Sequence, residues 1–389
     1  MVLKTAGQTK KYENFEQGAT TRERVLLGKI RLLEAKIEAQ QEGAESQTLL
    51  EQIEDMDAHQ DPEFDAEDGT KYELFQFSRL HKLQRAGYSQ DHLKDKLRTI
   101  KPSIRFRRLV RVTDDRIAAV VKLGQRYKNF TAFLDDVIVP QLYLQQQTGE
   151  PLRLQNFCLI GEPGIGKTAF LNDLTRALSI GGRIFDASTV QNAAVLNGLT
   201  RTYGNGDIGL IFSTMLFERD HDGRLMPGNT MLCIDEVEKM GREKQLGAAL
   251  DLLLTLLERQ TARRFVDAAV PELPLNLEYV NWCFTANSTT EMSAPLRSRI
   301  VEVEVPNPTP EQALDIAASI LEEEMERLRG KVKNLPDLDY GQLERLVSCS
   351  PRKQKQLLNL AIAKAMYRGE ASVTIPNFEK KSKVRMGFV

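Results

Sequence analysis

The sequence Gly161-Glu162-Pro163-Gly164-Ile165-Gly166-Lys167-Thr168 decides the fold class of this chain. It fits the pattern G-x-x-x-x-G-K-[ST], a loop whose backbone N–H groups surround the phosphates of a nucleotide. The apolar run Phe157–Ile160 before it predicts a buried strand, and Thr168–Leu178 after it carries its apolar residues on one helical face. A strand, a glycine loop and a helix N-terminus direct backbone donors at one point. The sequence therefore predicts binding of a nucleoside triphosphate.

We expect all eight residues of this loop to contact ATP. Glycine lets the backbone approach a phosphate without a Cβ atom in the way. Lys167 is predicted to reach the β- and γ-phosphates, and the hydroxyl of Thr168 is predicted to bind Mg²⁺. The loop alone therefore predicts ATP and Mg²⁺ as ligands.

Composition predicts an ordinary globular protein. The chain has 389 residues, of which 41% are hydrophobic and 28% charged, with a formal net charge of −1, so no overall field attracts nucleic acid or an acidic membrane. It has no apolar run long enough for a membrane helix, and residues 1–10 lack the apolar centre of a signal peptide. The four cysteines and four histidines lack metal-ligand spacing, and we expect reduced, buried thiols. We expect a cytoplasmic protein without a membrane contact.

Three regions follow one another along the chain. Residues 1–115 are predicted to be mostly helical, with a heptad-like apolar spacing at 26–37 that is too short for a coiled coil and better fits a helical hairpin, and an acidic linker at 51–68. Residues 116–305 alternate strands and helices, which predicts an α/β domain with a parallel five-stranded sheet. Residues 306–389 are predicted to form a small helical domain. The strand candidates are 156–160, 183–186, 231–234, 280–285 and 300–305.

The basic stretch Lys101–Arg111 interleaves arginines with apolar residues. Such a stretch is usually the solvated face of a strand or a linker, and contact with nucleic acid is the alternative.

Two predicted strands end in polar residues. Asp235 and Glu236 follow Met231–Ile234, and hydrolysis of a nucleotide needs one carboxylate for the Mg²⁺ shell and one to polarise the attacking water. Asp235 suits the first role and Glu236 the second. Asn287 ends the strand at 280–285 and could orient the water, although a strand-end asparagine is often only a turn residue.

Arg297 and Arg299 stand just before the last strand. A planar guanidinium stabilises charge on a transferring phosphoryl group, and a surface salt bridge is the alternative for each of them.

The order of these motifs resembles that of an AAA+ ATPase. Within that superfamily, residues 117–380 resemble the ATPase module of Lon-type proteases, because Gly198–Gly204 resembles the stretch with the first pore loop and Leu253–Leu277 resembles the segment after it. The resemblance implies an α/β ATPase domain followed by a helical lid. It also implies that Asn287 is sensor 1, that Arg299 is an arginine finger acting on a neighbouring subunit, that Arg352 is sensor 2 and that Tyr203 is the pore-loop aromatic.

The chain also departs from the family pattern. Lon-type proteases continue past the lid into a peptidase domain with a Ser–Lys dyad, whereas this sequence ends at Val389, and we expect no peptidase activity. Ser350 and Lys353 are close in sequence, but we expect them to be structural.

We therefore expect an ATP-driven remodeller that works as a homo-oligomeric ring, six subunits being the expected size, and that acts on a protein client. The N-terminal region would choose the client or dock a partner. The alternative is a nucleic-acid-associated AAA+ regulator of the transposition or defence type, in which Lys101–Arg111 would contact a duplex.

Overall fold

The computed structural model describes residues 69–85, 91–190, 192–200, 206–241, 247–332, 335–338 and 340–375. The chain divides into two units, 1–64 and 65–389, and the first lies wholly outside the described residues. The heptad-like spacing at 26–37, the acidic linker at 51–68 and Tyr203 also lie outside them.

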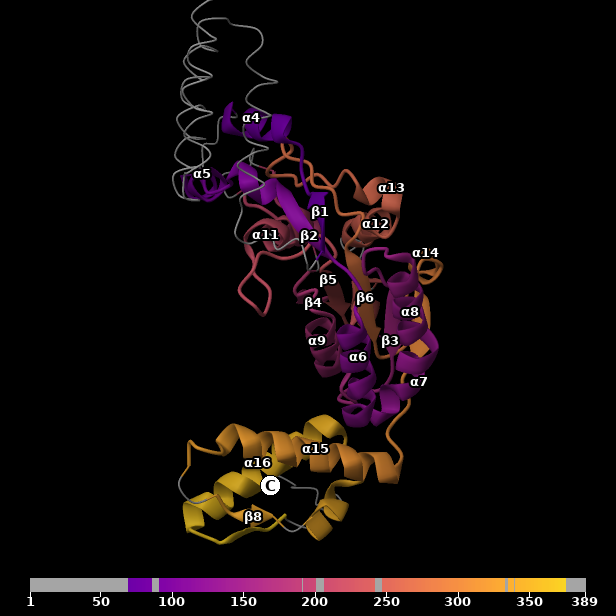
Figure 1. Cartoon of the computed structure of the whole chain (residues 1–389), viewed down its shortest axis with the longest axis vertical. Helices are drawn as coiled ribbons and strands as arrows, with labels where there is room; N and C mark the ends of the chain where they lie inside the picture. Colours follow the sequence, from indigo (N-terminus) through magenta and orange to yellow (C-terminus); the bar gives the residue numbers. More distant parts are fainter. Residues whose placement is uncertain are drawn as a thin grey trace, which may run out of the picture. The chain divides into compact units, whose positions relative to one another are not determined.

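Five parallel strands form the central sheet (Figure 1), in the order β4-β5-β6-β3-β7. Each strand lies within two residues of its predicted bounds, because each is an apolar run bounded by polar or turn residues. The α/β fold with a parallel five-stranded sheet is thus confirmed. The strands are β3 Phe157–Ile160, β4 Gly182–Asp186, β5 Met231–Asp235, β6 Asn281–Ala286 and β7 Val301–Glu304.

Helices cover both faces of this sheet. Phe157 and Leu159 pack on one face with residues of α6 (Asp114–Arg126), α8 (Val139–Thr148) and α9 (Lys167–Leu178). Cys158 and Ile160, which alternate with them, pack on the other face with α10 (Ala193–Asn197), α11 (Leu210–Phe217) and α12 (Gly247–Leu256). Burial on both faces explains why the strands are continuously apolar.

The remaining helical segments around the sheet are short. They are α7 Thr131–Phe133, α13 Arg259–Ala262, α14 Ala294–Arg297, the 3₁₀ turns Lys128–Phe130 and Val237–Gly241, and the π-helical turn Leu134–Ile138.

All four cysteines are free thiols. Cys158, Cys233 and Cys283 are buried in the sheet, and Cys349 is half-buried before the last helix.

The first described elements pack on the sheet layer. Strand β1 (Gly69–Glu73) pairs antiparallel with β2 (Phe106–Val110), and α4 (Phe77–Arg85) and α5 (Asp91–Arg98) lie between them in sequence. The apolar residues Leu74, Leu80, Leu93 and Leu97 join the same core cluster as α11. The expected helix over Tyr72–Leu83 is therefore wrong at its start, because Tyr72 pairs with Arg107 in the ladder and the helix begins only at Phe77.

The basic stretch forms a 3₁₀ turn (Pro102–Arg105) and β2. Its strand character is confirmed, but its central side chains are not solvated: Arg105, Arg107 and Arg108 are 6%, 2% and 7% exposed. Arg108 forms an ion pair with Asp220, which lies in the loop after α11. These arginines are thus part of the core rather than of a binding surface.

The C-terminal helices have a core of their own. Helix α15 (Pro310–Leu328) starts with the predicted capping box, in which Thr309 accepts from the Gln312 N–H and the Gln312 side chain accepts from the Thr309 N–H. Helix α16 (Pro351–Arg368), the 3₁₀ helix Tyr340–Leu346 and the parallel pair β8 (Asp337–Leu338) and β9 (Ser372–Val373) complete it. None of the helices in the described residues is both long and apolar enough to cross a membrane.

Candidate nucleotide site

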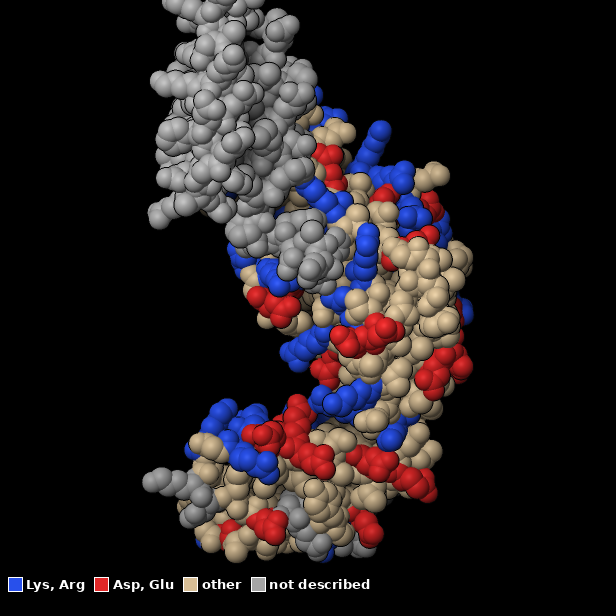
Figure 2. All heavy atoms as spheres, viewed as in Figure 1, with Lys and Arg blue, Asp and Glu red and all other residues tan. Residues whose placement is uncertain are grey.

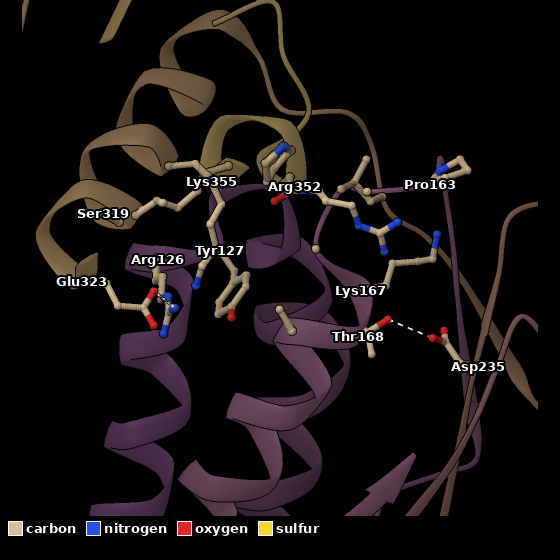
Figure 3. Close-up of a pocket in the computed structure, with 18 of the residues that line it drawn as sticks. Arg126, Tyr127, Pro163, Lys167, Thr168, Asp235, Ser319, Glu323, Arg352 and Lys355 are labelled. Carbon is tan, nitrogen blue, oxygen red and sulfur yellow. Dashed lines mark hydrogen bonds and ion pairs between the residues drawn. The ribbon is translucent and has the colours of Figure 1, made fainter. Parts of the chain in front are cut away.

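A pocket of about 290 Å³ lies where the carboxyl ends of the central strands meet the C-terminal helices (Figure 3). Ligands of open α/β sheets bind at this edge. The predicted site residues in its lining are Pro163, Gly164, Ile165, Gly166, Lys167, Thr168, Asp235, Glu236, Asn287 and Arg352. The structure therefore brings together residues that are spread over almost two hundred positions of sequence.

Three glycines of the loop are required by its geometry. Gly164 and Gly166 have φ values of +86° and +105°, which residues with a side chain rarely adopt. A Cβ atom on Gly161 would lie 2.6 Å from Ile165 Cδ1 and 2.7 Å from the carbonyl oxygen of Val305. Helix α9 begins at Lys167, so its N-terminus faces the pocket.

The Lys167 ammonium group is held by oxygen atoms at the loop. Its Nζ donates to the carbonyls of Gly161 (2.6 Å) and Glu162 (3.1 Å) and to Asn287 Oδ1 (3.2 Å). Burial lowers the pKa of Lys167, and the nearby carboxylate of Asp235 opposes that shift. The cation thus waits among weak acceptors, which phosphate oxygens can replace.

Two oxygen ligands suited to Mg²⁺ lie side by side in the pocket. Thr168 Oγ1 donates to Asp235 Oδ2 at 3.1 Å, and the dashed line in Figure 3 marks this contact. The hydroxyl of Thr285 on β6 bonds the other oxygen of Asp235 and accepts from the Glu236 N–H at 3.0 Å. Mg²⁺ is usually held by one or two protein oxygens together with substrate phosphates, so these residues fit that ion.

Glu236 has an unusual backbone for a residue with a side chain. Its φ of +59° lies in the left-handed region, a strain that is found mainly at functional sites. Its carboxylate pairs with Lys239 and accepts a long hydrogen bond (3.4 Å) from Asn287 Nδ2. The hydrogen bond from Lys239 lowers the pKa of Glu236, so this carboxylate is ionised at neutral pH and able to accept a proton.

Arg352 reaches the pocket from the first turn of α16. Its backbone N–H donates to the carbonyl of Gly164 at 3.2 Å, and Figure 3 shows its side chain extending over the loop toward Lys167. The Ser350 hydroxyl lies in the space next to Gly164, as the N-cap of the same helix. The predicted position of Arg352 beside the phosphate loop is confirmed, while its role stays a prediction.

Several residues of the pocket were not predicted from the sequence. Arg126 pairs with Asp173 on α9 (2.8 Å) and with Glu323 on α15 (2.5 Å), and the Tyr127 hydroxyl donates to Asp173 at 2.7 Å. No local sequence signal links Arg126 to Glu323, because 197 positions separate them. Glu238, in the turn after β5, is the one missed residue with a visible signal, since it continues the acidic run of Asp235 and Glu236.

Arg297 and Arg299 lie away from this pocket. Arg297 pairs with Glu302 through two hydrogen bonds (2.6 and 2.9 Å), and Arg299 pairs with Glu258 through two more (2.7 and 3.0 Å). Arg299 lines a separate groove of about 530 Å³ at the amino ends of β3 and β7. Within one chain the structure does not bring Arg299 to the phosphate loop, and Tyr203 lies outside the described residues.

Residues 157–307 match the family described as "ATPase family associated with various cellular activities (AAA)". This segment is an AAA ATPase domain. An AAA ATPase domain implies ATP binding and hydrolysis, in agreement with the pocket.

Curated relatives of this AAA domain include Lon proteases. The chain is 31% identical over 220 residues to Lon protease 4 of Sorangium cellulosum, which covers 54% of this chain and 25% of that protein. It is 27% identical over 213 residues to a Lon protease of Chloroflexus aggregans (54% and 24%) and 30% identical over 164 residues to the human mitochondrial Lon protease homolog (42% and 16%). The matched part spans a quarter or less of the length of these relatives. The domain is thus related to the ATPase module of Lon proteases.

Solved structures with a similar fold include a mutant of RuvB from Thermotoga maritima. It shares 15% sequence identity and a TM-score of 0.44, over 64% of this chain and 67% of that chain.

Proposed function

We propose that this chain is one subunit of a hexameric ring that hydrolyses ATP and uses the energy to remodel a protein client. The observation that carries the proposal is the placement of two conserved chemistries at opposite edges of one sheet. The phosphate loop follows the carboxyl end of β3, whereas Arg299 precedes the amino end of β7, which runs parallel to β3. An arginine that serves this pocket must then come from a neighbouring subunit.

The distance between the two edges supports a site shared by two chains. Asn156, just before β3, donates from Nδ2 to the carbonyl of Arg299 at 3.4 Å, so Arg299 begins at the amino end of β3 itself. A strand of four residues then separates it from the phosphate loop, roughly 13 Å at 3.3 Å per residue. An interface that joins one edge to the opposite edge of the next copy is head-to-tail, and such interfaces close into rings.

Within the pocket, each side chain has a task. The loop amides and Lys167 hold the phosphates, and Thr168 and Asp235 hold Mg²⁺, which neutralises phosphate charge when bound. Glu236 takes a proton from the attacking water, Asn287 orients that water, and Arg352 contacts the phosphates from the lid. The neighbouring subunit's copy of Arg299 stabilises the charge that develops during transfer.

A protein client is favoured by the relatives. They are named proteases, which act on proteins, and the similarity lies in the ATPase part. In this proposal residues 116–305 are the ATPase domain, 306–389 are the lid, and 1–115 contain the region that contacts a client or a partner. Tyr203 would grip the client through apolar contact as the loop moves.

The structure does not favour the nucleic-acid alternative. Lys101–Arg111 buries three of its arginines, and Arg108 is neutralised by Asp220. On the face that Figure 2 shows, basic and acidic side chains are interspersed. A duplex would need a continuous basic surface.

ATPase assays with and without an unfolded protein or duplex DNA test the proposal. We expect an unfolded protein to stimulate turnover and DNA to leave it unchanged. Stimulation by DNA alone would overturn the remodelling function and favour a nucleic-acid regulator.

A further inference from the structure

The turn after β5 carries a third carboxylate, and the proposed hydrolysis mechanism gives it no task. Glu238 lies in the 3₁₀ turn Val237–Gly241 and is 5% exposed. Its Oε1 accepts two hydrogen bonds from one residue, Asn287: one from the backbone N–H (3.0 Å) and one from Nδ2 (2.9 Å). One oxygen thus fixes both the position of the strand end and the rotation of its amide.

The groups around Asn287 determine which way the amide faces. Nδ2 lies 2.9 Å from Glu238 Oε1 and 3.4 Å from Glu236 Oε1, while Oδ1 lies 3.2 Å from Lys167 Nζ. Carboxylates only accept hydrogen bonds and an ammonium group only donates them. The flipped amide would place its oxygen against the carboxylates and its NH₂ against the ammonium, so only one orientation satisfies all three neighbours.

The other carboxylate oxygen of Glu238 indicates that this arrangement is costly. Within the described residues, Oε2 is buried and has no hydrogen-bond partner. Burial of an unsatisfied charged oxygen opposes folding. Buried carboxylates with such a cost are concentrated at functional sites. A carboxylate kept here only for stability would be expected to have both oxygens satisfied.

We propose that Glu238 is a positioning residue of the ATPase site, which holds the amide of Asn287 with its Oδ1 toward the phosphate-binding lysine and its Nδ2 toward Glu236. When phosphate oxygens replace Asn287 as the partner of Lys167, Oδ1 becomes available to accept from the attacking water. Glu238 itself touches no substrate and takes no proton. This inference rests on the proposed role of Asn287 in hydrolysis.

A double-mutant cycle on Glu238 and Asn287 tests the inference. The variants are Glu238→Ala, Asn287→Ala, their combination and the isosteric Glu238→Gln, with Glu302→Gln at the exposed pair with Arg297 as a control outside the pocket. Steady-state kinetics give kcat and KM for ATP, and thermal melts report stability. Misplacement of a catalytic group by about 1 Å costs roughly 10²-fold in rate, which is the loss in kcat that we expect for Glu238→Ala with KM nearly unchanged.

The other variants show whether Glu238 acts through Asn287. The double variant should be no slower than Asn287→Ala alone, since both changes remove the same positioned amide. Glu238→Gln should keep most of the activity, because its amide oxygen can still accept both hydrogen bonds.

Each contrary result has a distinct meaning. Wild-type kcat in Asn287→Ala would overturn the proposed role of Asn287, and with it this inference. A slow Asn287→Ala beside a fast Glu238→Ala, or losses that simply multiply in the double variant, would overturn the inference alone. If Glu238→Ala does not fold, Glu238→Asp takes its place: it keeps the charge but withdraws the oxygen by one methylene. The proposal then requires Asp to lose kcat while Gln keeps it, and the reverse order would refute it.

Discussion

Single side chains at the carboxyl ends of β3, β5 and β6 differ in whether they meet phosphate or act on water. Lys167 is the buried cation of the pocket and has three oxygen acceptors around its Nζ. Glu236 is held as a carboxylate by Lys239 on a strained backbone, which aims it into the same pocket. Removal of one or the other should therefore separate nucleotide binding from hydrolysis.

Lys167→Ala should abolish ATP binding, and Glu236→Gln should keep ATP bound while hydrolysis slows by about 10²–10⁴-fold, the usual contribution of a general base. Glutamine keeps the size of the side chain and loses only its basicity. Binding of a fluorescent ATP analogue and release of phosphate measure the two effects. Near-normal hydrolysis by Glu236→Gln would show that another group is the base.

The sequence predicted the site residues that follow a strand or belong to the phosphate loop, because their neighbours in sequence are also their neighbours in space. It could not predict Glu238 or Thr285 as partners of the site, since their hydrogen bonds join β5 and β6, about fifty residues apart. The burial of Arg108 was also beyond the sequence, because its partner Asp220 stands 112 positions away.

At the scale of elements, one buried carboxylate fastens the segment before α11 to the loop that precedes β6. Asp267 is fully buried, and its oxygens accept from the backbone N–H groups of Gly209 (2.8 Å) and Ala269 (2.9 Å). Gly198, with φ of +80°, packs so closely on the same carboxylate that a Cβ atom would overlap it. Both ends of the segment that contains Tyr203 therefore rest on Asp267.

Asp267 should make the stability of the protein depend on pH. Burial raises the pKa of Asp267 to about 7 from its usual 3.8, and Asp207 acts in the same direction, while the backbone hydrogen bonds oppose it. Between these values the folded chain keeps a proton that the unfolded chain releases. The free energy of unfolding should therefore fall as the pH rises from about 4 to 7, by up to about 1.4 kcal/mol per pH unit from this group.

Denaturant unfolding of the wild type and of Asp267→Asn across this pH range measures that contribution. The asparagine does not titrate, so the stability difference between the two proteins should change with pH and level off above pH 7. Parallel stability curves across the whole range would contradict the raised pKa.

Tyr203→Ala tests whether the loop carried by Asp267 grips a client. If Tyr203 threads a polypeptide, the variant should keep its basal ATPase activity and its melting temperature but lose unfolding of a tagged substrate. A packing role predicts instead a lower melting temperature with ATPase and unfolding falling together. A destabilised variant whose remaining ATPase stays coupled to unfolding would refute the pore-loop role.

Element boundaries were predictable where the hydrophobic pattern was unambiguous. The five sheet strands are continuous apolar runs between turn residues, and the Thr309–Gln312 capping box marks the start of α15 directly. Residues 69–76 were not predictable in the same way, because the apolar spacing around Tyr72 and Leu74 fits a helix as well as a strand. Pairing with β2, more than thirty residues later, decides between them.

At the scale of the whole molecule, the account depends on one chain completing the site of another. In the isolated chain Arg299 is neutralised by Glu258 and lies at the amino edge of the sheet, so no pocket has its arginine. Assembly into a ring would bring it to the γ-phosphate of the neighbour and exchange the Glu258 carboxylate for phosphate oxygens.

Arg299→Ala should lower kcat by about 10³-fold, the smaller end of the effect of an arginine finger. Arg297→Ala is the matched control, because Arg297 stands two residues earlier and pairs with Glu302 on its own strand. It should retain nearly full ATPase activity. Equal losses in both variants would indicate a structural role for this segment instead.

The ATPase activity of rings mixed from Glu236→Gln and Arg299→Ala subunits tests the shared site most directly. Each variant alone should be nearly inactive, and a mixture of Lys167→Ala with Glu236→Gln, whose defects lie in the same pocket, should stay inactive as a control. In the mixture of Glu236→Gln with Arg299→Ala, activity should return, because an Arg299→Ala subunit keeps its own Glu236 and receives Arg299 from a Glu236→Gln neighbour. Activity no greater than the sum of the two separate variants would contradict a site built from two subunits.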